Sequence, residues 1–375
     1  MIEAKSIQKR KIRQAVPIVT PEMEEAALDA LRNDRHIDGE NVAKFEEEFA
    51  RYVGTEYAVS TSSGTSALAF IFMALNAKAG KKFVTTPWSF VATANAVIHA
   101  GGHPIFADVS ERDFCLDPDL TQKLLERTDV EGILTVDLYG QPADFDRFEE
   151  LSKKHDTLVI EDAAQAHGAR YKGRMAGTLG IAAAFSFYPS KNMTVLGDGG
   201  MVTTNDEKIA KTVRKLRNSG RVARYEHDMV GFTARLNTVN AAIGRVQLKH
   251  LEEWNGKRKE VARRYASALE SVVKLPPMPG SGIEPVFHQF VIRAKHRDEL
   301  KKFLEENNVE VGVHYPIPIH LQPVYREMFG FDDGIFPVSE GLAKVVLSLP
   351  MHPMLSNEDV DYVCEKIREF YEHPS

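Results

Sequence analysis

The chain of 375 residues contains only two cysteines, Cys115 and Cys364, which lie far apart. Neither belongs to a pattern with the spacing of a disulfide framework or a zinc site, so we predict no disulfide and no metal. Cys364 falls on the apolar face of a predicted helix, and burial there explains it. A chain without paired cysteines is typical of a reducing compartment, which predicts a cytoplasmic protein.

Long hydrophobic runs and an excess of basic residues are missing as well. The most apolar later stretch, residues 181–187, is far too short to span a bilayer. The formal net charge is −6, whereas proteins that bind nucleic acid usually carry a basic excess. The basic segment 5–13 is not followed by the apolar run that a signal peptide needs, so we interpret it as a solvated N-terminal arm. We expect neither a membrane span nor a nucleic-acid partner.

Short apolar runs alternate with helical patterns from about Tyr57 to Thr203. The runs with strand character are Phe83–Thr86, Pro104–Ala107, Gly132–Val136, Thr157–Ile160 and Ala183–Phe187. Alternation of this kind predicts an α/β domain of three layers, in which helices cover both faces of a mostly parallel sheet. Ligands bind beyond the carboxyl ends of the strands in such sheets, so the residues just after each strand are candidates for chemistry.

The pattern changes after Ala234. A long helical stretch, 236–264, is followed by a segment rich in proline and glycine. A strand, a helix, a strand and a closing helix are then predicted, the first three at His288–Ala294, Arg297–Asn307 and Val309–His314. The length also favours two domains. We therefore predict a large domain, 1–250, and a smaller C-terminal α+β domain, 251–375.

Two polar segments follow predicted strands in the first half of the chain. In Ser62–Leu68, Gly64 lets backbone N–H groups approach an anion at the start of a helix, which suits a phosphate. An ordinary helix cap explains the same residues. Asp162 ends a later apolar strand, where a carboxylate can hold the nitrogen of a heterocycle protonated. Capping of the next helix is again the alternative.

A lysine completes the series. Lys191 lies two residues after Pro189, past the end of another apolar strand. Partial desolvation at such a place lowers the pKa of a lysine and makes it a nucleophile able to form a Schiff base. Most lysines are simply solvated. The order of phosphate cradle, acid and lysine, each just after a strand, favours the functional interpretation.

Further segments extend this pattern along the chain. They include Pro87–Phe90, Leu138–Pro142, Glu161–Gln165, Gly197–Gly200, Arg217–Asn218, Ala241–Gly244, Tyr315–Pro316 and Leu349–Pro350. Together they resemble the sugar aminotransferases of the DegT/DnrJ/EryC1/StrS family, which are fold-type I enzymes dependent on pyridoxal 5'-phosphate (PLP). The resemblance runs from about Ile18 to Phe370. It implies amino transfer from glutamate or glutamine to a nucleotide-linked keto sugar, in the biosynthesis of amino sugars for surface polysaccharide or glycoconjugates. It also implies a homodimer with shared active sites.

The resemblance assigns roles to individual residues. Lys191 would bind PLP as a Schiff base, and Asp162 would pair with the pyridine nitrogen, so these two are the predicted catalytic residues. Trp88 would stack on the ring and Gln165 would lie near its hydroxyl. The predicted phosphate contacts are Gly64, Thr65, Ser186 and, from the partner subunit, Thr233. The predicted substrate contacts are Tyr315, His320 and Asp137.

Two positions depart from the family pattern. The family often has asparagine in the segment that here reads Gly231–Arg235, and Thr233 takes its place. A shorter, neutral side chain weakens the expected contact with the phosphate of the neighbouring subunit. Asp137 stands where histidine is frequent, and we expect it to alter the sugar side of the site.

Three other functions are alternatives to this interpretation of the sequence. One is another PLP reaction on the same fold, such as a sugar dehydratase or an amino-cyclitol aminotransferase. The dehydratases carry histidine at the lysine position, so Lys191 argues against them. A second is a regulatory relative without activity, which the pair of Asp162 and Lys191 disfavours. A third is a dinucleotide-binding oxidoreductase, but no Gly-x-Gly-x-x-Gly motif follows the first strand.

Overall fold

The computed structural model describes residues 11–280 and 282–372. Of the predicted N-terminal arm, 5–13, residues 5–10 lie outside the described residues. A seven-stranded sheet forms the centre, in the order β1-β9-β8-β5-β4-β2-β3. Its strands are β1 (Tyr57–Thr61), β2 (Lys82–Thr85), β3 (His103–Phe106), β4 (Gly132–Val136), β5 (Leu158–Asp162), β8 (Ala182–Ser186) and β9 (Gly200–Thr204). Strands β3, β2, β4, β5 and β8 are parallel to one another. Strand β9 runs antiparallel to both of its neighbours, β8 and β1, so the edge strand β1 has the same direction as the other five. The predicted mostly parallel sheet is confirmed.

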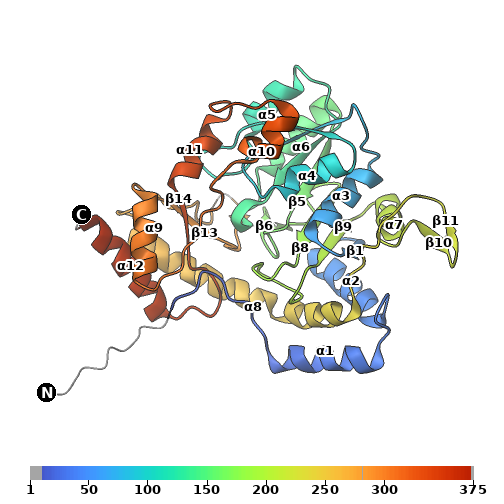
Figure 1. Ribbon diagram of the computed structural model, residues 1–375, viewed down its shortest axis with the longest axis horizontal. Helices are drawn as coiled ribbons and strands as arrows, with labels where there is room; N and C mark the ends of the chain where they lie inside the picture. The colour runs from blue at the N-terminus through green and yellow to red at the C-terminus, as the bar shows by residue number, and fades with distance from the viewer. Residues whose placement is uncertain (1–10, 281, 373–375) are drawn as a thin grey trace.

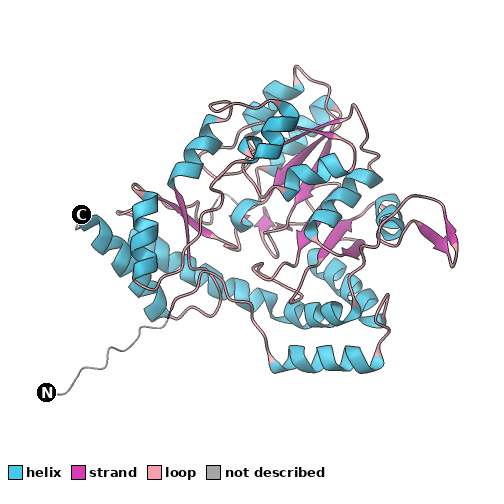
Figure 2. Ribbon diagram, viewed as in Figure 1, coloured by secondary structure: helices cyan, strands magenta, loops and turns pink. Residues whose placement is uncertain are grey.

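Alternate side chains along the strands point to opposite faces of the sheet and make separate cores. On one face Val59, Leu134 and Ile160 pack under α3 (Gly64–Ala74) and α7 (Glu207–Leu216). On the other face the neighbouring strand residues pack under helices from separate parts of the chain. These are α2 (Glu40–Val53), α5 (Pro118–Leu125), α6 (Phe145–His155) and the first half of α8 (Thr238–Leu269). Figures 1 and 2 show the resulting layers of helix, sheet and helix.

Helix α8 carries the chain from the sheet to the C-terminal elements. Its second half packs with β13 (Phe290–Arg293), β14 (Val346–Leu349), α9 (Arg297–Glu306) and α12 (Asn357–Glu372) around a core of their own. Helix α1 (Pro21–Asn33) lies along the opposite end of α8 (Figure 1). The predicted boundary at residue 250 falls inside this continuous helix, and the division into two domains stays a prediction.

The C-terminal third contains the differences from the predicted elements. The predicted strand Val309–His314 is wrong, because Gly312 makes only an isolated bridge with Ser348. The strand that pairs with β13 is instead β14, in antiparallel register. Residues 319–345 form η2 (Ile319–Leu321), α10 (Pro323–Phe329) and α11 (Pro337–Val345). Part of this segment returns to the large sheet, where Ile319 and Tyr325 pack on Phe106.

Short elements complete the described part of the fold. They are α4 (Ala92–His99), η1 (Leu138–Gly140), β6 (Arg170–Tyr171), β7 (Arg174–Met175), β10 (Arg221–Ala223), β11 (Glu226–His227) and β12 (Ile283–Glu284). Strands β10 and β11 form a hairpin that projects from the molecule (Figure 1). Within the described ranges, no helix combines the length and apolar character needed to cross a membrane.

Candidate active site

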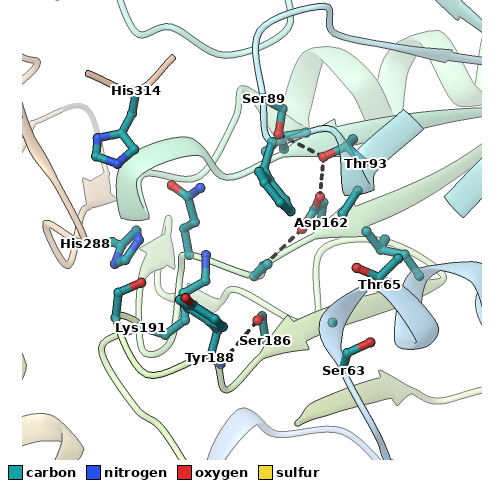
Figure 3. A pocket seen from close by; sticks show the side chains of 18 of the residues that line it. Ser63, Thr65, Ser89, Thr93, Asp162, Ser186, Tyr188, Lys191, His288 and His314 are labelled. Carbon is teal, nitrogen blue, oxygen red and sulfur yellow. Dashed lines mark hydrogen bonds between the residues drawn. The ribbon is translucent and has the colours of Figure 1, made fainter. Parts of the chain in front are cut away.

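A cavity of ≈ 510 Å³ opens beyond the carboxyl ends of the parallel strands. The cavity is lined by the last residues of three parallel strands, Val136 of β4, Asp162 of β5 and Ser186 of β8. Segments 288–289 and 314–315 from the C-terminal part form the opposite wall. The cavity therefore lies where a parallel α/β sheet places its ligands, and Figure 3 shows the side chains directed into it.

The first turn of α3 supplies the anion-binding end of the cavity. The Ser63 side chain accepts a hydrogen bond from the Ser66 amide at 3.1 Å, and the Ser66 hydroxyl accepts one from the Ser63 amide at 3.0 Å. These mutual bonds fix the start of the helix, whose outward N–H groups and dipole favour an anion. A Cβ on Gly64 would lie 2.7 Å from the Cβ of Ser186, so only glycine permits this close approach. Gly64, Thr65 and Ser186 all line this end of the cavity, and their contact with a phosphate stays a prediction.

Asp162 ends β5 and is held from two sides. Its Oδ2 accepts a hydrogen bond from the Thr93 hydroxyl at 2.8 Å, and its Oδ1 accepts one from the Ala164 amide at 3.2 Å. The Thr93 hydroxyl in turn lies 2.8 Å from that of Ser89. Burial raises the pKa of Asp162, while the Thr93 and Ala164 bonds and the charge of Lys191 oppose that rise. The carboxyl group is thus fixed in direction, and the charge of Lys191 only partly offsets the effect of its burial.

Lys191 extends into the same cavity from the turn after β8 (Figure 3). Its backbone amide donates to the carbonyl of Tyr188 at 2.9 Å, which closes the turn. Desolvation lowers the pKa of its amine to about 8, although the charge of Asp162 acts in the opposite direction. An amine with this pKa is partly neutral near neutral pH, so Lys191 can act as a nucleophile and as a base.

Gln165 and Tyr315 connect the two walls of the cavity. The side-chain oxygen of Gln165 accepts a hydrogen bond from the Tyr139 backbone amide at 2.7 Å, and its side-chain nitrogen donates to the Tyr315 hydroxyl at 3.1 Å. Both residues line the cavity, as predicted from the sequence. Burial, aided by the charge of Lys191, lowers the pKa of His314 to about 4 and that of His288 well below its ordinary value. Both imidazoles are neutral at physiological pH.

Sequence reasoning missed several of these residues. The cavity also contains Ser89, Phe90, Thr93, His288, Gln289 and His314. Ser89 and Thr93 had a usable signal, since they follow a predicted strand at helical spacing. For His288, Gln289 and His314 there was no such signal, because tertiary packing brings their segments to the sheet.

Trp88 does not line the cavity, which corrects its expected placement. It is fully buried and packs with Phe114 and Tyr139. The reason is the tight turn after β2, in which the Trp88 amide donates to the Thr86 hydroxyl at 2.9 Å. Phe90 instead lines the cavity and is 56% exposed. Phe90 is therefore the aromatic side chain of this segment that faces the cavity.

Two of the predicted substrate contacts also lie elsewhere. His320 is fully buried against Phe336 and lies 3.2 Å from Glu340 Oε1. Its own structural partners account for it, so the expected place near the substrate is wrong. Asp137 is fully buried behind the cavity wall, where its Oδ1 accepts a hydrogen bond from the Ala143 amide at 3.1 Å. Because Asp137 is buried and does not line the cavity, its expected contact with the sugar is wrong.

Thr233 lies on the outer surface, apart from the cavity of its own chain. It pairs with Asn218 in an isolated bridge next to the β10–β11 hairpin. This placement is compatible with the predicted contact across a subunit interface, which stays a prediction.

Comparison with known proteins gives consistent matches over the whole chain. The model of the DegT/DnrJ/EryC1/StrS aminotransferase family matches residues 17–368. The chain is 37% identical to dTDP-3-amino-3,4,6-trideoxy-alpha-D-glucose transaminase of Streptomyces venezuelae, over 96% of this chain and 95% of that protein. It is 40% identical to a pleiotropic regulatory protein of Geobacillus stearothermophilus, over 94% and 95%. The crystal structure of DesV from S. venezuelae superposes with a TM-score of 0.91, at 38% identity over 94% and 95% of the two chains.

Proposed function

Because the chain belongs to the DegT/DnrJ/EryC1/StrS aminotransferase family, we propose that it moves an amino group from an amino acid to a nucleotide-linked keto sugar. The observation that carries the proposal is the cavity shared by Lys191, Asp162 and the Gly64 cradle. The sugar transaminase of S. venezuelae, at 37% identity over nearly the full length, supports this substrate class. We propose glutamate or glutamine as the donor and amino sugars for surface polysaccharide or glycoconjugates as the product.

The described residues fit PLP, the cofactor of this aminotransferase family. Gly64 allows the first turn of α3 to approach Ser186 closely, which a side chain would prevent, and so brings the N–H groups of the helix start and the Ser186 hydroxyl to one place suited to a phosphate. Asp162, at the end of β5, is suited to a protonated pyridine nitrogen, and Phe90 offers a flat apolar surface to the ring. When bound, PLP supplies the electron sink that stabilises negative charge on the α-carbon of the donor.

The residues of the chain divide the work around that cofactor. Lys191 would hold it as a Schiff base, and once freed its amine would take the proton from the α-carbon of the donor. It would return that proton at C4′ of the cofactor. Asp162 would keep the pyridine nitrogen protonated, because a fixed negative charge favours the protonated base. The neutral His288 and His314 suit hydroxyl groups of a sugar, since a neutral imidazole both donates and accepts a hydrogen bond.

The test is incubation of the purified protein with a panel of nucleotide-linked 3-keto and 4-keto sugars. Glutamate and glutamine are supplied in separate reactions, and amino-sugar formation is followed by mass spectrometry. A regulatory role without catalysis is the second candidate, favoured by the match to the pleiotropic regulatory protein. An absorption spectrum without bound PLP, together with no product from any sugar, would support that candidate instead.

Phe90 is the aromatic side chain that we propose stacks on the cofactor ring. Phe90→Ala is expected to weaken PLP binding roughly tenfold, since aromatic stacking contributes about 0.5–1.5 kcal/mol beyond the apolar area. Trp88→Phe is the control, because Trp88 lies outside the cavity. Titration of the cofactor-free protein with PLP measures both. A larger loss in the Trp88 variant would return the stacking role to Trp88.

We also propose a homodimer in which Thr233 and Arg235 reach the active site of the partner. The support is their position just after the β10–β11 hairpin, in a stretch of chain where the side chains of Tyr225, Val230 and Phe232 are exposed. Exposed large apolar side chains are frequent at protein interfaces. The unpaired Cys115 and Cys364 favour the cytoplasm as the place of action.

Shared sites predict complementation between inactive variants. Lys191→Ala and Arg235→Ala proteins are each expected to be inactive alone and to regain part of the activity after mixing and reassembly. Mixed dimers then contain one site with both residues intact. Activity is measured after mixing, and sedimentation reports the oligomer. An active monomer, or no recovery in any mixture, would contradict the shared site.

A further inference from the structure

Two buried carboxyl groups lie behind the cavity wall, and neither has a role in the function proposed above. Asp137 follows β4 and Glu161 is the next-to-last residue of β5, and both are fully buried. The two strands are parallel neighbours, with Val136 opposite Asp162. Since successive strand residues point to opposite faces, Glu161 points away from the cavity that Asp162 enters. The pair therefore lies directly behind the predicted partner of the cofactor.

The hydrogen bonds of the two carboxyls are unequal. Glu161 accepts backbone bonds from Gly177 at 2.6 Å and Leu179 at 3.0 Å, and the Gly180 amide also stabilises its charge. Asp137 accepts a single backbone bond, at Oδ1. Its Oδ2 is buried, and no donor from a described residue reaches it. Amide donors stabilise a carboxylate, so negative charge is more stable on Glu161 than on Asp137.

Two adjacent buried carboxylates without a cation would be strongly unfavourable. We infer that Asp137 and Glu161 share one proton, which Oδ2 of Asp137 carries and donates to Glu161, and that this bond positions Asp162. Asp137 is also tied to Asp162 directly, because its amide donates to the Asp162 carbonyl at 3.1 Å. The bond would join the ends of β4 and β5 to the Gly177–Gly180 turn. Asp137 is then a positioning residue, and only this last step rests on the proposed function.

The electrostatic surroundings agree with a retained proton. Burial raises the pKa of Asp137 well above its ordinary value, and the charges of Glu161 and Asp162 raise it further. The thiol of Cys115 is a further titratable neighbour, and burial raises its pKa well above the ordinary value, so the neutral thiol adds no charge beside the pair. In the unfolded chain Asp137 ionises at about pH 4. The folded protein therefore loses stability from this group as pH rises from about 4 towards the raised pKa.

The test uses Asp137→Asn in the cofactor-free protein. Asparagine has nearly the same shape and donates to Glu161 at every pH. The thermal midpoint of the variant is expected to match that of the parent near about pH 4 and to exceed it by a growing margin as the pH rises towards the raised pKa of Asp137. Infrared difference spectra at neutral pH should show the carbonyl band of a protonated carboxylic acid in the parent and its loss in the variant. Asp108→Asn is the control, since the buried Asp108 carboxylate accepts bonds from Val338 and Ser339.

A second variant separates the hydrogen bond from packing. Asp137→Leu fills a similar volume but donates nothing, so it should lower PLP affinity several-fold, whereas Asp137→Asn should retain it. An acid band that survives in Asp137→Asn, or a midpoint difference that does not grow with pH, would overturn the shared proton. Equal PLP affinity in the Asn and Leu variants would overturn the positioning role. The infrared and thermal measurements need neither substrate nor cofactor, so they stand even if the proposed reaction is wrong.

Discussion

Lys191→Ala is expected to abolish transamination and to leave the fold intact. Loss of a general acid and base alone lowers turnover by about 10²–10⁴-fold, and loss of the Schiff-base nucleophile adds to that. The structure places Lys191 half-buried at the cavity wall rather than in a core. Its removal therefore leaves no core void of the kind that destabilises proteins. Lys172→Ala is a matched control, because Lys172 pairs with Asp146 at the surface.

Chemical trapping identifies the lysine independently of turnover. Reduction with borohydride should fix PLP to the peptide that contains Lys191, and peptide mapping reads the position. The rate of PLP capture by the cofactor-free protein should rise with pH and level off above about 8, because the neutral amine is the nucleophile and the pKa of Lys191 is lowered to about 8. Fixation at another lysine, or a capture rate that rises only near the ordinary lysine pKa, would contradict the assignment.

The five parallel strands β2, β3, β4, β5 and β8 were predictable from sequence because they are short apolar runs bounded by polar residues, whereas the antiparallel strand β9 was not predicted. Predicted and observed strands differ by one or two residues at their ends, and Gly132–Val136 agrees at both. The three residues after strand ends, at Gly64, Asp162 and Lys191, were predictable for the same reason. A parallel sheet brings its carboxyl ends to one edge, so strand positions alone place these residues around one cavity.

The direction of single side chains could not be predicted in this way. Trp88 and Phe90 stand two residues apart in the same segment, and the turn held by Thr86 decides which of them enters the cavity. Asp137 occupies a position where the family resemblance suggested a contact with the sugar, but its hydrogen bond to Ala143 turns it behind the wall. Such choices depend on contacts between segments distant in sequence.

The C-terminal wall was less predictable still. His288 and His314 stand at the ends of the predicted strands His288–Ala294 and Val309–His314, neither of which belongs to the large sheet, so strand positions gave no guide to the cavity here. The strand β14 follows α11 directly, so its apolar run continues the helical pattern and gave no separate signal. Its pairing with β13 is decided by the packing around α8 rather than by local periodicity.

Asp162→Asn is expected to lower turnover by about 10²–10⁴-fold while PLP still binds, a loss comparable to that of other catalytic proton-holding groups. Asparagine keeps the shape and can still accept the hydrogen bond from Thr93. It carries no negative charge, so the pyridine nitrogen loses the group that keeps it protonated, and the electron sink weakens.

Stability separates this chemical effect from a structural one. Burial raises the pKa of Asp162, so in the cofactor-free protein its ionised form costs stability above the ordinary aspartate pKa. The neutral asparagine removes that cost, and the variant should unfold at a temperature no lower than the parent at neutral pH. Thr93→Val is the control, since it keeps the charge of Asp162 and removes one hydrogen bond to the carboxylate, a loss of about 1.5–3 kcal/mol. Near-native turnover in Asp162→Asn, or a loss of activity matched by a lower unfolding temperature, would show that the charge of Asp162 is not what the reaction requires.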